Sequence, residues 1–202
     1  MTPVTSSPRG ENDNNAKRPT MTSLKTDRLI LRPLELSDAP RIAALCADWD
    51  VARMTGSMPF PHPAISVEGF LLIEQARRAS GRDRLFAIEA PGEGLIGVIG
   101  AHLRGRDYSG RFVLLGYWLG RPYWGRGYAT EAVRAVADYA ADLGFGPVRA
   151  DHFADNPASG RVLEKAGFRY TGETEQHFSL ARRQNAASRL MQRYAEVRER
   201  AA

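Results

Sequence analysis

A glycine-rich phrase after an apolar run gives this chain its clearest chemical signal. Gly125 and Gly127 lie in the segment Tyr123-Trp124-Gly125-Arg126-Gly127-Tyr128-Ala129-Thr130. The following apolar residues have the spacing of one buried helical stripe: Ala129, Ala132, Val133, Val136, Ala140 and Leu143. The first turn of a helix has backbone N–H groups without internal partners, and the helix dipole is positive at that end. Because glycine has no Cβ to keep an anion away, the pattern predicts a phosphate cradle built mainly from backbone amides.

Two common nucleotide-binding loops do not fit this phrase. A Walker-type loop needs Lys and then Ser or Thr after its second glycine, whereas Gly127 is followed by Tyr128 and Ala129. A dinucleotide fingerprint needs glycine or alanine three residues after the second glycine, where this chain has Thr130. Two glycines alone are also typical of a simple helix cap. The residues around them are therefore needed to distinguish a phosphate site from a cap.

The longer phrase, from Gly116-Tyr117-Trp118-Leu119 through Ala132, closely resembles the acetyl-CoA pyrophosphate loop of the GNAT N-acetyltransferases. It is most similar to the RimJ/RimL-like branch, the ribosomal-protein-alanine acetyltransferases. The superfamily pattern is Gln/Arg-x-x-Gly-x-Gly/Ala, and Trp124, Gly127 and Ala129 take its first, fourth and sixth places, with Trp being usual in this branch. The resemblance implies acetyl-CoA as cosubstrate and no metal. It implies a cofactor site made by Tyr117, Trp118, Leu119, Trp124, Gly125, Arg126, Gly127, Tyr128, Ala129, Thr130, Asn156 and Ser159.

Two further segments extend the resemblance along the chain. The segment from Asn156 to Phe168 is similar to the second acetyl-CoA segment of this branch. Its pattern is Asn-x-x-Ser-x-x-Val-Leu-Glu-Lys-x-Gly-Phe. The first predicted strand also resembles the usual N-terminal sequence of this branch, with Thr26-Asp27-Arg28-Leu29-Ile30-Leu31-Arg32-Pro33-Leu34. The motifs occur in the family's order and spacing.

The resemblance implies direct transfer of acetyl from acetyl-CoA to a primary amine in a ternary complex. Many superfamily members protonate the departing thiolate with a tyrosine seven residues after the Asn, but here that position is Leu163. The RimL-like branch uses the Ser159 position instead, and a serine hydroxyl can donate to sulfur. Ser159 is therefore the expected acid, although a serine in a first helical turn also solvates the backbone. Asn156 is expected to hold the pantetheine amides, and backbone N–H groups near Tyr117 to Leu119 to stabilise the oxyanion.

The expected general base lies on the strand after Gly167 and Phe168, because the branch uses a carboxylate there. Alternation along that strand places Glu173, Glu175 and His177 on one face. Glu175 is the first candidate and His177 the second, with Asp151 on the preceding strand in reserve. Each of them could also be an ordinary exposed residue.

Residue patterns predict the elements that must position these groups. Strands are expected at 29–33, 85–89, 95–103, 112–119, 147–152, 170–180 and 186–194. Helices are expected after caps at Ser37 or Asp38, at Ser66, at Gly127 and at Asn156. The first three long strands form an antiparallel meander, and the helix after Gly127 crosses over to a parallel strand at 147–152. The expected fold is the α/β (α+β) GNAT type, a mixed, mostly antiparallel sheet with one splayed parallel pair and flanking helices. The pantetheine arm would enter that opening.

Other segments carry weaker expectations. The loop at 54–63 supplies Phe60 and His62 as candidate acceptor contacts, since the family builds its acceptor wall there. Residues 1–22 are polar and are expected to be a disordered tail, with 23–202 forming a single acetyltransferase domain. Composition at 192–200 also favours a frayed helix.

Composition limits the function classes. The 202 residues contain one cysteine, Cys46, which excludes an internal disulfide and is expected in the core. No run has transmembrane length and no signal core opens the chain, so a cytoplasmic protein is expected. The net charge of +5 does not suggest nucleic acid, because six arginines and two glutamates at 181–200 account for most of it.

Together these features predict an N-acetyltransferase acting on a peptide N-terminus or a small amine, as a monomer or homodimer without nucleic-acid or membrane partners. The alternative is a non-catalytic acyl-CoA-binding regulatory module, which Leu163 favours and Ser159 with the acidic strand opposes.

Overall fold

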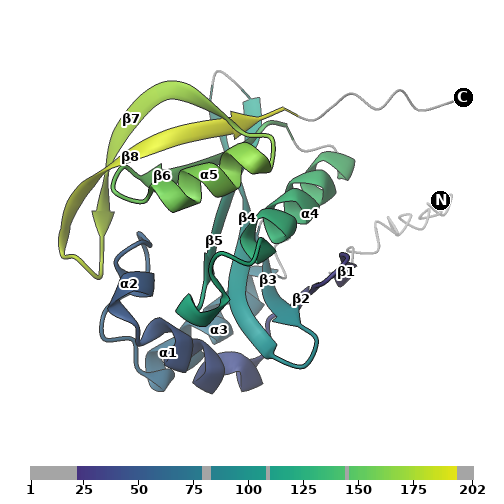
Figure 1. The fold of residues 1–202 in the computed structure, drawn as a ribbon, viewed down its shortest axis with the longest axis vertical. Coiled ribbons are helices and arrows are strands. Elements are labelled where there is room, and N and C mark those ends of the chain that lie inside the picture. Colours follow the sequence, from purple (N-terminus) through teal and green to yellow (C-terminus); the bar gives the residue numbers. More distant parts are fainter. Residues whose placement is uncertain (1–21, 79–82, 108–109, 144–145, 195–202) are drawn as a thin grey trace, which may run out of the picture.

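The computed structural model describes residues 22–78, 83–107, 110–143 and 146–194, and the strands in these ranges form one sheet in the order β1-β2-β3-β4-β5-β6-β8-β7 (Figure 1). The strands are β1 (Leu24–Lys25), β2 (Ile30–Pro33), β3 (Asp83–Ala90), β4 (Gly94–Asp107), β5 (Gly110–Leu119), β6 (Val148–Phe153), β7 (Arg169–Ser179) and β8 (Gln184–Arg193). The helices are α1 (Ala39–Cys46), α2 (Trp49–Ala52), α3 (Ala64–Arg78), α4 (Tyr128–Asp142) and α5 (Pro157–Lys165), with 3₁₀ turns η1 (Leu36–Asp38) and η2 (Arg121–Tyr123).

The sheet confirms the expected mixed fold, because β5 and β6 are its parallel pair and the other strand pairs are antiparallel. Helix α4 packs against β4 and β5, and α5 packs against β6 and α4 (Figure 1). The core between the layers is apolar, with Leu31, Phe86, Ile88, Ile99 and Val133 fully buried. Cys46 is also fully buried, as expected, and its desolvation raises the pKa of the thiol to about 12.

The parallel pair separates after a short common stretch. Val113 pairs with Val148 and Leu114 pairs with Arg149, and the β5–β6 ladder contains no later pair among the described residues. The rest of β5, as far as Leu119, continues to pair with β4 on its other side. One edge of β5 from Leu115 onward is therefore open, which is the splayed opening predicted from the crossover.

In the C-terminal hairpin, the second strand, β8, lies next to β6, and the first strand, β7, lies outside it. Strand β8 pairs with β6, and β7 pairs only with β8 within the described residues, so β7 is an edge strand. The strand expected at 186–194 is confirmed by β8, so the helix suggested at 192–200 is wrong for Gln192 and Arg193, which pair with β6. Pairing across the sheet overrides the local helical preference there. The remainder of that segment, residues 195–202, and residues 1–21 of the proposed tail lie outside the described residues.

Three local expectations need correction. Asp38 occupies the position before α1, but its carboxylate accepts hydrogen bonds from Arg32 and from the Glu35 N–H instead of capping that helix, and Ser37 contacts Glu35. Helix α3 begins at Ala64, so Ser66 lies in its first turn, where its hydroxyl donates to Pro63 O at 2.9 Å. Leu143 follows α4 and is 42% exposed, so the buried stripe of α4 ends at Ala140.

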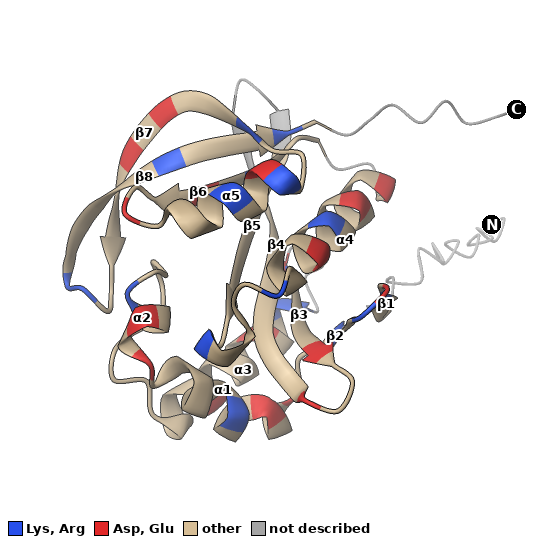
Figure 2. Cartoon of the chain, in the orientation of Figure 1, with Lys and Arg blue, Asp and Glu red and all other residues tan. Residues whose placement is uncertain are grey.

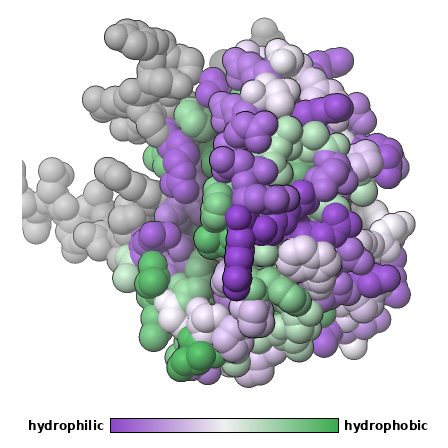
Figure 3. All heavy atoms as spheres, turned by 90° about the vertical axis from the view of Figure 1, so that its left-hand side faces the viewer, coloured by the Kyte–Doolittle hydropathy of each residue, from purple (hydrophilic) through white to green (hydrophobic). Residues whose placement is uncertain are grey.

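The surface mixes polar and apolar side chains. Hydrophilic side chains cover most of the face in Figure 3, and hydrophobic atoms gather at its lower left. Helix α3 carries exposed apolar side chains, including Ile65, Leu72 and Ile73. Among the described helices, none combines the length and the hydropathy needed to cross a membrane.

Candidate active site

The turn between β5 and α4 has the backbone geometry that the glycine phrase predicts. Gly125 and Gly127 have φ of 74° and 81°, in the left-handed region that favours glycine. Trp124 donates its indole N–H to Leu119 O at 2.8 Å, which ties the turn to the end of β5. Within the described residues, the backbone N–H groups of Gly125, Arg126 and Gly127 have no hydrogen-bond partner. They lie before the N-terminus of the 15-residue helix α4.

The other predicted cofactor residues surround this turn. Tyr117, Trp118 and Leu119 form the open end of β5, where the Leu119 side chain is buried and Tyr117 and Trp118 are half-buried. Tyr128, Ala129 and Thr130 form the first turn of α4, whose backbone N–H groups precede the helical ladder. The Arg126 guanidinium lies 5.8 Å from the centre of the Tyr123 ring. These residues lie along one stretch of the chain, from the open end of β5 to the first turn of α4.

A pair of hydroxyl groups spans the opening between β5 and the start of α5. Tyr117 Oη lies 2.8 Å from Ser159 Oγ and also donates to Ser159 O at 3.2 Å. Burial raises the pKa of Tyr117 to about 12, although its hydrogen bond with Ser159 acts in the opposite direction. Tyr117 therefore keeps its proton at neutral pH. Leu163, at the usual tyrosine position, is fully buried in the core.

Asn156 caps α5 as predicted. Its side-chain oxygen accepts the Ser159 N–H at 3.2 Å, and Pro157 occupies the first turn. The cap fixes the backbone of Ser159, whose hydroxyl faces Tyr117. Asn156, Ser159 and Tyr117 thus form one hydrogen-bonded group.

A second polar cluster joins three of the residues considered as the base. His177 Nε2 lies 2.9 Å from Glu175 Oε2, and His177 Nδ1 lies 3.0 Å from Asp151 Oδ2. Ser188 donates a hydrogen bond to the same Asp151 oxygen. Partial burial lowers the pKa of His177, but the hydrogen bond and charge of Glu175 and the charge of Asp151 outweigh it, so the pKa is raised.

Glu173 does not join this cluster. Its backbone N–H bonds to Thr171, and the β7–β8 register shifts between Tyr170 and Thr174, where Gly172 has φ of 91°. The irregular backbone interrupts the simple alternation that placed Glu173 with Glu175 and His177. No hydrogen bond connects the His177 cluster to the Tyr117–Ser159 pair within the described residues.

The turn after β7 is fastened to the loop that follows α2. Ser179 Oγ donates to Thr55 O at 3.1 Å, and Leu180 N donates to Gly56 O at 3.0 Å. Arg182 donates to Arg53 O at 2.6 Å and forms two hydrogen bonds with the Asp155 carboxylate, at 2.9 and 3.1 Å. The contacts connect the edge of the sheet, the 53–56 backbone and the turn before α5.

Phe60 and His62 lie further along the same loop. Phe60 packs edge-on against Trp49 with ring centres 5.2 Å apart. His62 Nδ1 contacts Ser66 Oγ at 3.0 Å, and burial lowers the pKa of His62. The structure shows their positions on the loop, and their roles as acceptor contacts stay predictions.

Sequence reasoning missed three contacts. The sequence places Tyr117 in the cofactor site but gives no sign of its hydroxyl contact with Ser159, and it singles out neither Arg28 nor Arg182. A tyrosine on the open strand and an arginine in the opening motif were signals in the sequence. For Arg182 no sequence pattern pointed to its partners, which lie 27 and 129 positions away.

Charged side chains are interspersed over the molecule. Figure 2 shows both acidic and basic residues on α4, and Arg193 of the C-terminal strand pairs with Asp138 of α4 at 2.6 Å. In the part of the chain that the structure describes, no group of three His, Cys, Asp or Glu side chains could hold a metal ion.

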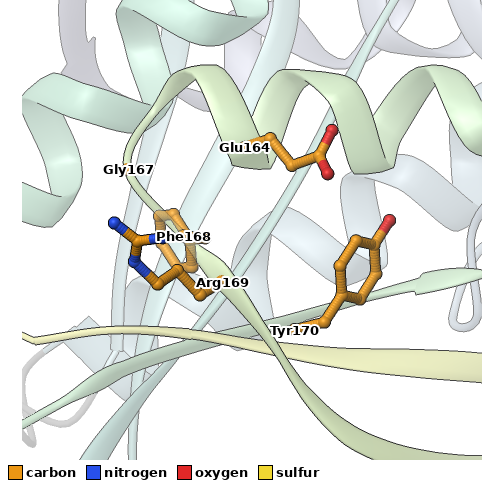
Figure 4. Close-up of a pocket in the computed structure, with 5 residues that line it drawn as sticks. All are labelled: Glu164, Gly167, Phe168, Arg169 and Tyr170. Carbon is orange, nitrogen blue, oxygen red and sulfur yellow. The ribbon is translucent and has the colours of Figure 1, made fainter.

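A cavity of about 400 Å³ lies at the far end of α5 (Figure 4). It is lined by Glu164, Gly167, Phe168, Arg169 and Tyr170. Glu164 lines it from the last turn of α5, and the hydroxyl of Tyr170 lies close to Gly160, the residue after Ser159.

Comparisons with known proteins identify the family and agree with the fold. The family model described as an acetyltransferase (GNAT) domain matches residues 28–169. An uncharacterized N-acetyltransferase, YoaA of Bacillus subtilis, is 34% identical over 160 residues, covering 76% of this chain and 86% of the relative. RimJ of Mycobacterium smegmatis, solved with CoA-disulfide, has a TM-score of 0.73 at 21% identity, covering 86% and 85% of the two chains. The microcin C7 self-immunity acetyltransferase MccE, solved with acetyl-CoA and AMP, has a TM-score of 0.72 at 17% identity, covering 84% and 94%.

Proposed function

Because this chain belongs to the GNAT acetyltransferase family, we propose that it transfers acetyl from acetyl-CoA to a primary amine by direct attack in a ternary complex. The observation that carries the proposal is the open edge of β5, which has a glycine-rich turn at its end and the Ser159 hydroxyl across from it. The opening offers backbone groups to a flexible arm, the turn offers amides to a phosphate, and the hydroxyl offers a proton. Transfer of acetyl from acetyl-CoA would use all three.

In this proposal the pyrophosphate of acetyl-CoA binds at the glycine-rich turn between β5 and α4. The N–H groups of Gly125, Arg126 and Gly127 and the first turn of α4 would donate to phosphate oxygens. The pantetheine arm would run along the open β5 edge toward Tyr117, with Asn156 near its amides. That RimJ and MccE were solved with CoA-disulfide and acetyl-CoA supports this cofactor.

The departing thiolate needs a proton, and Ser159 is proposed to supply it. Its hydroxyl already shares a hydrogen bond with Tyr117, whose own proton is retained because its pKa is about 12. When Ser159 donates to sulfur, Tyr117 can donate to Ser159 Oγ and stabilise the developing negative charge. The pair would thereby replace the tyrosine that Leu163 excludes.

The attacking amine must lose a proton, and the His177–Glu175 pair is proposed to accept it. Both ring nitrogens of His177 contact a carboxylate, so neutral His177 would take the proton at Nε2 when the amine displaces Glu175 there, while Asp151 holds Nδ1. Asp151 and Glu175 both stabilise the imidazolium that forms. Glu175 is the alternative acceptor, because its side chain is the more exposed of the two at 61%.

The acceptor is proposed to be a protein N-terminal α-amine or a small-molecule amine. The loop at 53–63 and the β7–β8 turn, which Arg182 joins, would form the acceptor wall, with Phe60 and His62 as contacts. Release of free CoA from acetyl-CoA, measured against peptides with free N-termini and a panel of small amines, tests this proposal. Release with peptides alone would identify an N-terminal acetyltransferase, and release with small amines alone would identify a small-molecule enzyme.

The second candidate is a regulatory module that binds acyl-CoA without turnover. The buried Leu163 favours it, because the usual acid is missing. Tight acetyl-CoA binding by calorimetry, together with no CoA release across the whole panel, would select this reading.

A further inference from the structure

Arg28, from the turn between β1 and β2, reaches the glycine-rich loop almost one hundred positions later in the chain. Its Nη1 donates to Arg126 O at 3.0 Å. Its Nε donates to Glu131 Oε2 at 2.8 Å, and its Nη2 lies 2.7 Å from the same oxygen. The guanidinium also lies 4.9 Å from the centre of the Tyr128 ring. One side chain therefore contacts both the loop and the first turn of α4.

The position of this guanidinium is fixed from several directions. The backbone N–H of Arg28 donates to Glu131 Oε1 at 2.8 Å, and Thr26 Oγ1 donates to that oxygen at 2.6 Å. The Glu131 carboxylate thus binds the β1–β2 turn through both of its oxygens. Because a guanidinium is planar and rigid, holding Nε and Nη2 on Glu131 also fixes the direction of Nη1 toward Arg126 O.

The bond to Arg126 O has a consequence for the next residue. In a trans peptide the C=O and the following N–H point in opposite directions. With the Arg126 carbonyl directed at Arg28, the Gly127 N–H is directed away from Arg28, and it has no hydrogen-bond partner within the described residues. Packing is close here, since a Cβ on Gly127 would lie 3.3 Å from Arg28 Nη2.

We infer that Arg28 is a positioning residue of the pyrophosphate loop, which orients the Gly127 N–H for phosphate by holding the Arg126 carbonyl. This inference deepens the proposed function and rests on its placement of acetyl-CoA. It gives the opening Thr-x-Arg segment a role in cofactor binding, although this segment is far from the glycine-rich loop along the chain.

Arg28 also offsets an unfavourable charge. Glu131 is an acidic group one turn into α4, where an anion is proposed to bind, and its side chain is 16% exposed. Burial raises the pKa of Glu131, but hydrogen bonds from Thr26 and Arg28 outweigh it, so the carboxylate stays ionised. Without Arg28 this charge would repel phosphate. The geometric and the charge effects must therefore be separated experimentally.

The test is the Kd of CoA, measured by titration calorimetry for the wild type, Arg28→Ala, Arg28→Lys and Arg104→Ala. Arg104 is a matched control, because its side chain is 47% exposed against 51% for Arg28 and it also contacts a carboxylate, Asp83. We expect Arg28→Ala to raise the Kd about tenfold or more, in line with the loss of charge-assisted hydrogen bonds. Arg28→Lys keeps the charge but not the fork, so it should recover only part of the affinity. Arg104→Ala should stay within about twofold of the wild type.

Salt separates the two effects. At about 1 M salt the screening length is roughly 3 Å, so repulsion by Glu131 is largely removed while a misdirected N–H remains misdirected. A persistent gap between the wild type and Arg28→Ala supports positioning, whereas a gap that closes, or full recovery by Arg28→Lys, overturns it. Gly127→Glu places bulk and charge in the loop itself: unchanged CoA binding in that variant would contradict the proposed function. Lost binding there with a normal Kd in both Arg28 variants would contradict only this inference.

Discussion

At the scale of single residues, the proposed chemistry depends on whether two hydroxyl groups can replace the tyrosine that protonates the thiolate in many superfamily members. Tyr117 comes from the open strand and Ser159 from the first turn of α5, so their contact crosses the opening in which the thioester is proposed to lie. A serine alone would bear the developing negative charge until water returns its proton. Tyr117, which keeps its own proton, can donate a hydrogen bond to Ser159 Oγ over 2.8 Å and stabilise that charge.

Ser159→Ala is expected to lower kcat on the order of a hundredfold, a typical loss for a general acid, with little change in the Kd of acetyl-CoA. Tyr117→Phe should lower kcat less, because Ser159 remains next to sulfur. Steady-state kinetics with calorimetry for the Kd would measure both effects. A wild-type kcat in Ser159→Ala would remove the serine from the mechanism.

The His177 cluster predicts a pH dependence. Only neutral imidazole can accept a proton, so the rate should rise as His177 deprotonates. The carboxylates raise the pKa of His177 despite its partial burial, which moves this rise to higher pH than for an ordinary histidine. Glu175→Gln removes one raising charge, and the midpoint of kcat/KM against pH should therefore move to lower pH.

His177→Gln is the companion variant, in which that rise should disappear. An unchanged midpoint in Glu175→Gln would place the base elsewhere. A rise that disappears in Glu175→Gln while surviving in His177→Gln would make Glu175 the base.

At the scale of elements, Arg182 joins three segments that meet only in the folded chain. It donates hydrogen bonds to the backbone of Arg53 and to the carboxylate of Asp155. Its guanidinium also lies 4.6 Å from the centre of the Phe153 ring. Arg182→Ala should release the β7–β8 turn from the 53–56 backbone and cost about 1–3 kcal/mol of stability. Because the acceptor wall is proposed there, the KM for the amine should rise several-fold while the Kd of CoA stays unchanged.

The control is Arg183→Ala in the same turn, and kinetics with thermal unfolding would separate the two effects. Arg183 is exposed, and alanine keeps the same Cβ at its φ of 54°, so its side chain can be shortened without removing the contacts of Arg182. A rise in the Kd of CoA equal to the rise in acceptor KM would show a general loss of structure instead of a wall.

The elements also show what could be predicted from the sequence. Local signals were sufficient for the β5–turn–α4 unit, since Gly127 and the apolar stripe after it are read within one short window. The contacts of Glu175 with His177 followed from alternation along one strand. By contrast, Asp151 and Tyr117 acquire their partners through strand order and the splay, and Gln192 takes strand form because β6 pairs with it. Such tertiary pairings leave no pattern in a short window.

At the scale of the whole molecule, the proposed acetyl-CoA site combines segments that are far apart along the chain. Arg28 and Glu131 join the β1–β2 turn to α4, the open edge belongs to β5, and Ser159 belongs to α5. A ligand that contacts all of these segments binds the folded chain and not the unfolded one. CoA should therefore raise the midpoint of thermal unfolding, with a gain of about 2.7 kcal/mol at a hundred times its Kd.

The size of that gain should follow occupancy of the loop and not the chemistry of transfer. Gly127→Glu should lose the shift almost completely, because φ of 81° strains any side chain there and a Cβ at that position would crowd the Arg28 guanidinium, with Nη2 only 3.3 Å away. Ser159→Ala should keep it, since the serine is proposed to act on sulfur after binding. Differential scanning calorimetry with and without CoA would compare the three proteins. A full shift in Gly127→Glu would mean that the glycine-rich turn does not hold the cofactor, and a lost shift in Ser159→Ala would mean that the hydroxyl pair supports binding and not catalysis.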